Sequence, residues 1–167
     1  MVIELTTEDR LALRELVEAY AGAVDRFDVA AVVALFAPEG RMVAPHPAGG
    51  DRPPIRHEGH ARLTTALDAG LGAYRLLTHV IGGLELTAAD AAAGTAAGTT
   101  TCLAHHVFER EGRDRLLVLG IKYRDRYVRL DGCWRFAERD LDFQWRDERW
   151  LTMQPSPGAA APAEGEG

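Results

Sequence analysis

The chain has 167 residues, of which 47% are hydrophobic and 26% charged, enough to bury the core of one globular domain. Its formal net charge of -6 argues against a nucleic-acid-binding surface, and no apolar run approaches the ~18 residues that a membrane span needs. The N-terminus lacks a secretory signal pattern, and the two cysteines, Cys102 and Cys133, are too few for a disulfide scaffold. The sequence therefore predicts a cytoplasmic protein that interacts with neither nucleic acid nor membrane.

The first part of the chain predicts three helices. Apolar side chains recur at helical spacing from Leu13 to Phe27, behind a threonine that can cap the helix. Asp28 is typical of an N-cap and predicts a short second helix over 29–36. A third helix is predicted over 61–71, where glycines end it.

The remainder predicts strands. Residues with high β-propensity gather in five segments, 41–44, 74–86, 98–109, 116–130 and 134–145. Asp131-Gly132 predicts a hairpin turn, whereas the Pro-rich stretch 44–54 and the Ala/Gly-rich stretch 88–97 predict loops. Helices followed by antiparallel strands indicate an α+β domain over residues 1–152, with the helices on one face of a curved sheet. Residues 153–167 predict a disordered tail.

Histidines in the middle of strands are the first candidates for chemistry. His79 stands in one predicted strand, and His105 and His106 stand side by side in the next. Because side chains alternate along a strand, only one of the adjacent pair can point to a given face. A strand histidine can satisfy a core hydrogen bond or transfer a proton near neutral pH, and the residues alone leave both interpretations open.

Metal, nucleophilic and nucleotide chemistry have less support. The histidine spacings match no common metal motif, so we expect no metal. No Gly-x-Ser-x-Gly motif and no Gly-rich phosphate loop occurs in the sequence. We therefore expect no cofactor.

The acidic candidate is Asp25, near the end of the first predicted helix. Unlike Asp28, it is not explained by capping. At ~100° per residue, Asp25 lies ~140° around the helix from Tyr20, which belongs to the apolar stripe. Helical geometry thus favours core packing for Tyr20 and exposure for Asp25.

Four segments carry a family resemblance: YAGAVDRFD at 20–28, ALFAP at 34–38, GIKYRDRYVR at 120–129 and DGCWRF at 131–136. In these segments the chain resembles the nuclear transport factor 2-like superfamily, and more closely its SnoaL-like branch of polyketide cyclases and dehydratases. The resemblance extends over nearly all of residues 5–150. It implies a cone-shaped barrel, in which a curved mixed or antiparallel sheet is capped by three N-terminal helices around one deep apolar cavity.

The resemblance also implies a catalytic set. Dehydratases of this branch use an aspartate from the first helix, a histidine from the strand after the third helix and a histidine from the next strand. Asp25, His79 and His105 occupy those places, and Tyr20 stands five residues before the aspartate, as it does in some members. His106 replaces His105 if the register differs by one residue.

The implied reaction begins with an enolate. His105, oriented by Asp25, would take a proton α to a carbonyl, or assist the departing hydroxyl, of a hydroxylated cyclic ketone or polyketide. His79 would supply the complementary acid or base, and Tyr20 would donate a hydrogen bond to the enolate oxygen. Dehydration, isomerisation and cyclisation all stay open. Further residues expected to contact the small apolar substrate are His106, Tyr123 and Phe27.

A non-catalytic interpretation also stays open, because the superfamily includes ligand-binding proteins and structural subunits. An enzyme would show the candidate residues around one closed cavity, whereas a structural subunit would show a filled interior and an apolar outer patch. In either case we expect a homodimer or homotrimer.

Overall fold

The computed structural model describes residues 5–46 and 49–153 and contains three helices and one sheet of six strands. The helices are α1 (Thr7–Asp25), α2 (Val29–Ala34) and α3 (His60–Leu71). The strands are β1 (Phe36–Ala44), β2 (Ile55–Glu58), β3 (Leu76–Asp90), β4 (Thr95–Arg110), β5 (Arg113–Leu130) and β6 (Cys133–Trp150). None of the described helices has the length and apolar character of a membrane span.

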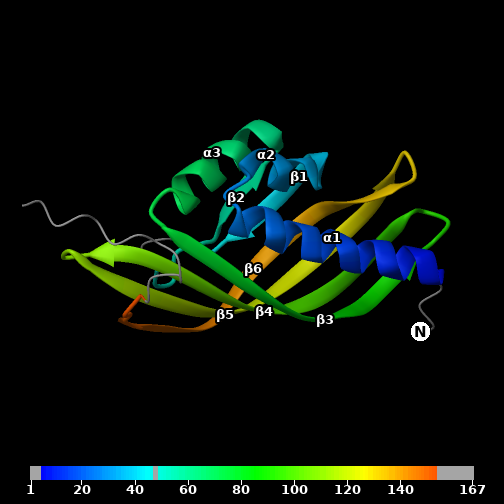
Figure 1. The fold of residues 1–167 in the computed structure, drawn as a ribbon. Coiled ribbons are helices and arrows are strands. Elements are labelled where there is room, and N and C mark those ends of the chain that lie inside the picture. The colour runs from blue at the N-terminus through cyan, green and yellow to red at the C-terminus, as the bar shows by residue number, and fades with distance from the viewer. Residues whose placement is uncertain (1–4, 47–48, 154–167) are drawn as a thin grey trace, which may run out of the picture.

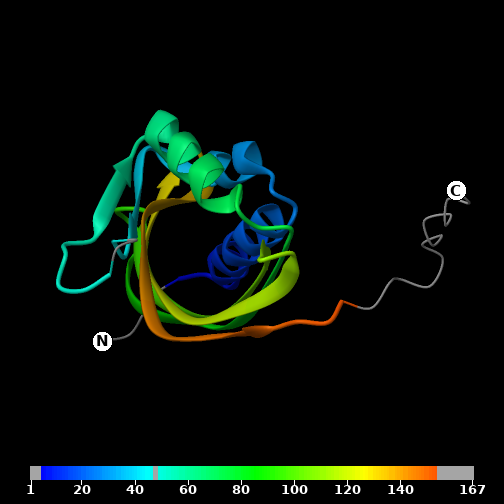
Figure 2. The same ribbon diagram turned by 90° about the vertical axis from the view of Figure 1, so that its left-hand side faces the viewer.

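The sheet is mixed and strongly curved. Its strand order is β2-β1-β6-β5-β4-β3, with β1 parallel to β6 and every other neighbouring pair antiparallel. Figure 1 shows the long strands curving beneath α1, and the end-on view in Figure 2 shows them curling around α1 without closing, with α2 and α3 over the open side. The α+β cone with three helices over its concave side is therefore confirmed.

The helix starts follow the predicted caps. Thr6 accepts a hydrogen bond from the Asp9 backbone N–H at 3.0 Å, and Asp28 accepts one from Ala31 at 3.0 Å. The second helix is shorter than expected, because the chain enters β1 at Phe36. This strand pairs in parallel with the distant β6, a contact that local sequence patterns do not reveal.

Two tight turns set the register of the long strands. Asp131 and Gly132 both have positive φ, as do Glu111 and Gly112, which is the signature of type I′ hairpins. The predicted hairpin at 131–132 is thus confirmed.

The loop predicted over 88–97 is wrong. Strands β3 and β4 continue through this stretch, where Ala88 pairs with Ala97 and Ala89 with Ala96, and only residues 91–94 turn. Cross-strand pairing overrides the low β-propensity of alanine. Residues 47–48 of the predicted Pro-rich loop, and the predicted tail from residue 154 on, lie outside the described residues.

A fully buried ion pair lies in the core between β5 and β6. Arg139 donates to both carboxylate oxygens of Asp125, at 2.9 and 2.7 Å, and the Tyr127 hydroxyl donates to the same carboxylate at 3.0 Å. Burial alone would lower the pKa of Arg139, but the facing Asp125 carboxylate raises it, so the guanidinium stays charged. This cation packs against the rings of Tyr20 and Tyr123, at 4.1 and 4.2 Å from their centroids.

Replacing Asp125 by alanine should destabilise the fold by about 3–5 kcal/mol, because it leaves a buried guanidinium without its counter-charge. Urea unfolding followed by circular dichroism measures the change. Arg124→Ala is the matched control: it removes a largely exposed ion pair with Asp142 from the same two strands and should cost under about 1 kcal/mol. Equal losses in the two variants would contradict the importance of the buried pair.

Candidate active site

One cavity of about 560 Å³ lies between the concave face of the sheet and the helices. This volume suits a small organic molecule of a few rings. Most of its wall is apolar, formed by Val24, Met42, Ala44, Ala66, Leu67, Leu71, Leu117, Leu119, Ile121, Leu141 and Phe143. The polar side chains in the wall are therefore conspicuous: Tyr20, His57, Tyr74, His79, His106, Tyr123 and Arg146.

A carboxylate–imidazole dyad forms where α1 ends against β3. Asp25, the last residue of α1, accepts a hydrogen bond from the backbone N–H of His79 at 3.0 Å. Its other oxygen lies 2.6 Å from Nδ1 of the His79 ring. The two contacts hold the imidazole in one orientation against the carboxylate.

The dyad fixes the tautomer of His79. Because the carboxylate is an acceptor, the ring proton of the neutral imidazole lies on Nδ1 and the lone pair on Nε2. The His79 side chain is 5% exposed and lines the cavity, whereas Asp25 is behind it and does not. Nε2 makes no hydrogen bond within the described chain, so it is available as a base.

A second histidine, His106 of β4, lines the same cavity. Its ring centroid lies 5.5 Å from that of His79 and 4.5 Å from that of Tyr74. Burial, together with the adjacent His79, lowers the pKa of His106 from 6.5 to about 4, so it is neutral at pH 7. Its Nδ1 is buried without a hydrogen-bond partner in the described structure. His106 can therefore exchange hydrogen bonds with a ligand but is a weak base.

Two phenols complete the polar wall. Tyr20 and Tyr123 are buried, and their rings meet edge to face at 6.0 Å. Burial raises the pKa of both hydroxyls, so each is a neutral O–H donor at physiological pH. The Tyr20 hydroxyl interacts with the buried Arg139 guanidinium and lies 3.9 Å from the Met42 sulfur, a weak acceptor that an oxygen of a ligand can replace.

Two expected site residues lie elsewhere. His105 pairs with Thr78 and Val118, on the face opposite to His79, and its Nδ1 lies 3.3 Å from the Thr78 carbonyl oxygen. The expectation that His105 acts in the cavity, oriented by Asp25, is therefore corrected: strand alternation brings His106 there, and Asp25 pairs with His79.

Phe27 also lies outside the cavity. It adopts a φ of 57° where the chain reverses between α1 and α2, and its side chain is 38% exposed. The ring does not belong to the cavity lining. Its expected contact with substrate is corrected on this ground.

Sequence reasoning missed Tyr74 and Arg146. Tyr74 lies just before β3, where no motif marks it, and Arg146 is one of several arginines in an alternating charged stretch of β6. Only cross-strand register could have placed either of them. Among the described residues, histidines, cysteines and carboxylates do not gather in a group of three that could hold a metal ion.

The comparisons with known proteins agree with this architecture. The model of the SnoaL-like domain family matches residues 5–140, and the chain belongs to this family. No curated protein matches the sequence.

Solved structures share the fold at low sequence identity. A proposed scytalone dehydratase from Novosphingobium aromaticivorans superimposes with a TM-score of 0.70 at 20% identity, over 92% of this chain and 95% of that one. A hexachlorocyclohexane dehydrochlorinase superimposes with a TM-score of 0.71 at 16% identity, over 92% of this chain and 96% of that one. The β subunit of a proposed aromatic-ring-hydroxylating dioxygenase from N. aromaticivorans superimposes with a TM-score of 0.66 at 17% identity, over 84% of this chain and 92% of that one. At these identities the likeness establishes the fold alone.

The lowered pKa of His106 predicts a pH-dependent stability. Between pH 6.5 and about 4 the unfolded chain binds a proton at this residue and the folded chain does not, so stability falls as pH falls. Urea unfolding at pH 7 and pH 5 should therefore show a larger loss for the wild type than for His106→Gln. The same pH dependence in both proteins would contradict a buried neutral His106.

Proposed function

We propose that the chain is a cofactor-independent lyase that removes water from a hydroxylated, largely apolar cyclic ketone. The observation that carries the proposal is the 2.6 Å contact between Asp25 and Nδ1 of His79 at the wall of an apolar cavity. A base needs a lone pair aimed at substrate and a partner that stabilises its protonated form. His79 offers the first and Asp25 the second.

The reaction needs only one base. Nε2 of His79 takes the proton α to the carbonyl, and the electron pair moves into the carbonyl to give an enolate. When the enolate collapses, the bond to the β-hydroxyl breaks, and the same His79 returns its proton to the leaving oxygen. Water and a conjugated enone result, and the imidazole is neutral again.

The enolate oxygen requires hydrogen-bond donors. Tyr20 and Tyr123 both line the cavity and both remain protonated, because burial raises their pKa values. Each can donate an O–H to the developing negative charge from a buried position in the cavity wall. The neutral His106 can orient the hydroxyl that leaves.

The structural neighbours support elimination chemistry. One bears the name of a dehydratase and another that of a dehydrochlorinase, and both names denote the loss of a leaving group together with a proton. The same enolate could instead isomerise or cyclise, and a panel of substrates distinguishes these outcomes.

A non-catalytic role on the same fold is the alternative, favoured by the dioxygenase β subunit among the neighbours. An open apolar cavity next to an oriented imidazole supports the enzyme instead, because a purely structural subunit needs neither.

Self-association is compatible with both roles, and we propose a homo-oligomer formed through the outer face of the sheet. Val80 and Leu103 are direct partners there and are 52% and 38% exposed. Trp145, which is 50% exposed and also borders the cavity, continues the row through Gly120. Exposed apolar side chains gathered in this way are typical of an interface.

The decisive test is proton exchange and dehydration by dyad variants. Wild-type protein should exchange the α-protons of α-tetralone in D₂O and dehydrate β-hydroxycyclohexanone, followed by NMR and ultraviolet absorbance. His79→Gln and Asp25→Asn should each lower both rates by roughly 10²–10⁴-fold, because they remove the base or its orienting partner. His105→Gln, on the opposite face, is the matched control and should keep the wild-type rates.

Three results would reject the proposal. They are the absence of exchange across the ketone panel, rates unaffected in His79→Gln, and loss of activity only together with the folded circular dichroism spectrum.

Tyr20→Phe should lower kcat by roughly 10²-fold while KM changes little, since it removes a donor needed chiefly in the transition state. Steady-state kinetics on the substrate turned over by the wild type measure both constants. A rise in KM with constant kcat would instead assign Tyr20 to ground-state binding.

A further inference from the structure

One row of side chains crosses the cavity from the dyad to a guanidinium group. His79, Ala104, Leu119 and Arg146 are direct partners in the successive pairs β3–β4, β4–β5 and β5–β6. Directly paired residues project from the same face of a sheet, so Arg146 shares the concave face with His79. Three strand spacings, roughly 14 Å along the curved sheet, separate the two strands. The residues between them, Ala104 and Leu119, are apolar.

A register shift in β6 turns Arg146 inward. Leu141 and Phe143, which pair with Tyr123 and Ile121, face the cavity, so in this part of β6 the odd-numbered residues point inward. The next pair is Gly120 with Trp145, so Gln144 is an extra residue, and the alternation reverses. Without it, Arg146 would project from the outer face.

Arg146 carries the net charge of the cavity wall. Among the described lining residues it is the single Lys or Arg, and none is Asp or Glu. The histidine facing the cavity centre, His106, has its pKa lowered to about 4 and is uncharged at pH 7. A ligand inside the cavity therefore meets one permanent positive charge, on the side away from the dyad.

The guanidinium is only partly compensated. Its Nη2 donates to Glu148 at 2.8 Å, but Glu148 also pairs with Arg115 at 2.7 Å and lies 3.7 Å from Arg110. One carboxylate thus serves three cations. Nε and Nη1 of Arg146 have no hydrogen-bond partner within the described chain.

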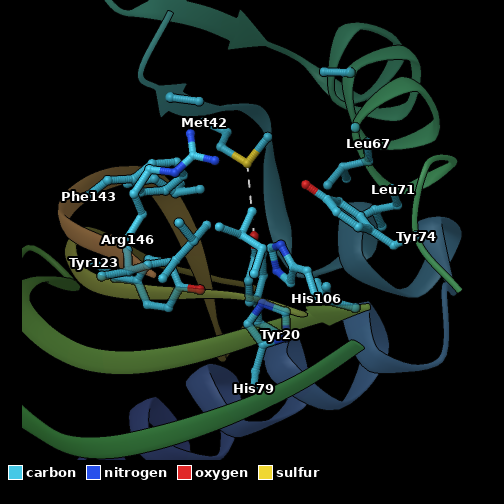
Figure 3. Close-up of a pocket in the computed structure, with 18 of the residues that line it drawn as sticks. Tyr20, Met42, Leu67, Leu71, Tyr74, His79, His106, Tyr123, Phe143 and Arg146 are labelled. Carbon is cyan, nitrogen blue, oxygen red and sulfur yellow. Dashed lines mark hydrogen bonds between the residues drawn. The ribbon is translucent and has the colours of Figure 1, made fainter. Parts of the chain in front are cut away.

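The charge is also felt across the cavity. Burial raises the pKa of Tyr74, and the positive charge of Arg146 acts on it in the opposite direction. Figure 3 shows the Arg146 guanidinium and the Tyr74 hydroxyl projecting from opposite sides toward the space near Met42. A guanidinium and a hydroxyl donor that face one space form a receptor for a carboxylate.

We propose that the substrate is an apolar ring system bearing a carboxylate, which binds Arg146 while the carbon to be deprotonated lies at His79. The part of this inference that concerns the reacting carbon rests on the proposed function. The part that concerns the carboxylate rests on the cavity alone. Leu119, which lies between the two groups in this row and lines the cavity, offers the ring system an apolar surface, and Tyr74 offers the carboxylate a second donor.

The test compares two probes of the same shape, β-naphthoate and the neutral β-naphthamide, by isothermal titration calorimetry. Wild-type protein should bind the carboxylate roughly fivefold more tightly, a preference that falls at high salt because Arg146 is partly exposed. Arg146→Gln should abolish the preference, and Arg146→Lys should keep part of it. Arg149→Gln is the matched control: it removes a similarly exposed arginine paired with Asp147 in the same strand and should leave the preference unchanged.

The outcomes separate this inference from the proposed function. Equal binding of the two probes, a preference retained in Arg146→Gln, an equal loss in Arg149→Gln, or no binding of either probe at millimolar concentration would overturn it. His79→Gln should keep the carboxylate preference while α-proton exchange is lost. If the wild type prefers the carboxylate but exchanges no α-protons, the lyase proposal is rejected and the anion site is supported. If it exchanges α-protons but binds both probes equally, the anion site is rejected and the lyase proposal is supported.

Discussion

The contact between Asp25 and His79 joins the helical layer to the sheet. β3 is an edge strand, so the backbone N–H of His79 that points away from β4 has no strand partner. Asp25 supplies the acceptor for it and the orienting carboxylate for the ring from one side chain. An unpaired strand edge is thereby covered, and α1 is fixed over the concave face. The position of the cavity wall and the orientation of the His79 imidazole thus depend on the same interaction.

The polar groups of the cavity divide into neutral donors and fixed charges. Tyr20, Tyr123 and His106 are neutral at pH 7 because burial disfavours their charged forms. Behind the two phenols lies a permanent cation, Arg139, which the buried Asp125 keeps charged. The rings pack against a buried ion pair whose disruption would cost several kcal/mol, so their hydroxyls are held in place before a ligand binds. Preorganisation of this kind costs stability in the core and lowers the reorganisation needed during a reaction.

Local patterns in the sequence predicted the elements well and the contacts between distant elements poorly. The caps at Thr6 and Asp28 and the turn at Asp131 depend on neighbouring residues, and they formed as expected. The extension of β1 back to Phe36 depends on pairing with the distant β6, and the continuation of β3 through Ala88 depends on pairing with β4; both were missed. Helical periodicity put Asp25 off the apolar stripe, which is correct, because this carboxylate meets the edge of the sheet rather than the cavity.

The residues of the site were also predicted where local patterns or resemblance place them, and missed where the strand register decides. Resemblance placed Asp25 and His79 in one site, but the choice between His105 and His106 depends on a register that a single strand does not reveal. The inward direction of Arg146 could not be predicted from the sequence either, because it is set by an unpaired residue in its own strand.

The unpaired Gln144 has a consequence for how such a cavity changes over generations. An insertion or deletion of one codon in this part of β6 reverses the direction of every side chain between that point and the next turn. The strand β3, which carries His79 at the other end of the strand order from β6, keeps its register. A chain of this type can therefore gain or lose a charged cavity wall in one genetic step while the Asp25–His79 contact stays intact. Whether the cavity wall carries a charge then depends on the length of one strand, which comparisons of aligned residue identities alone would overlook.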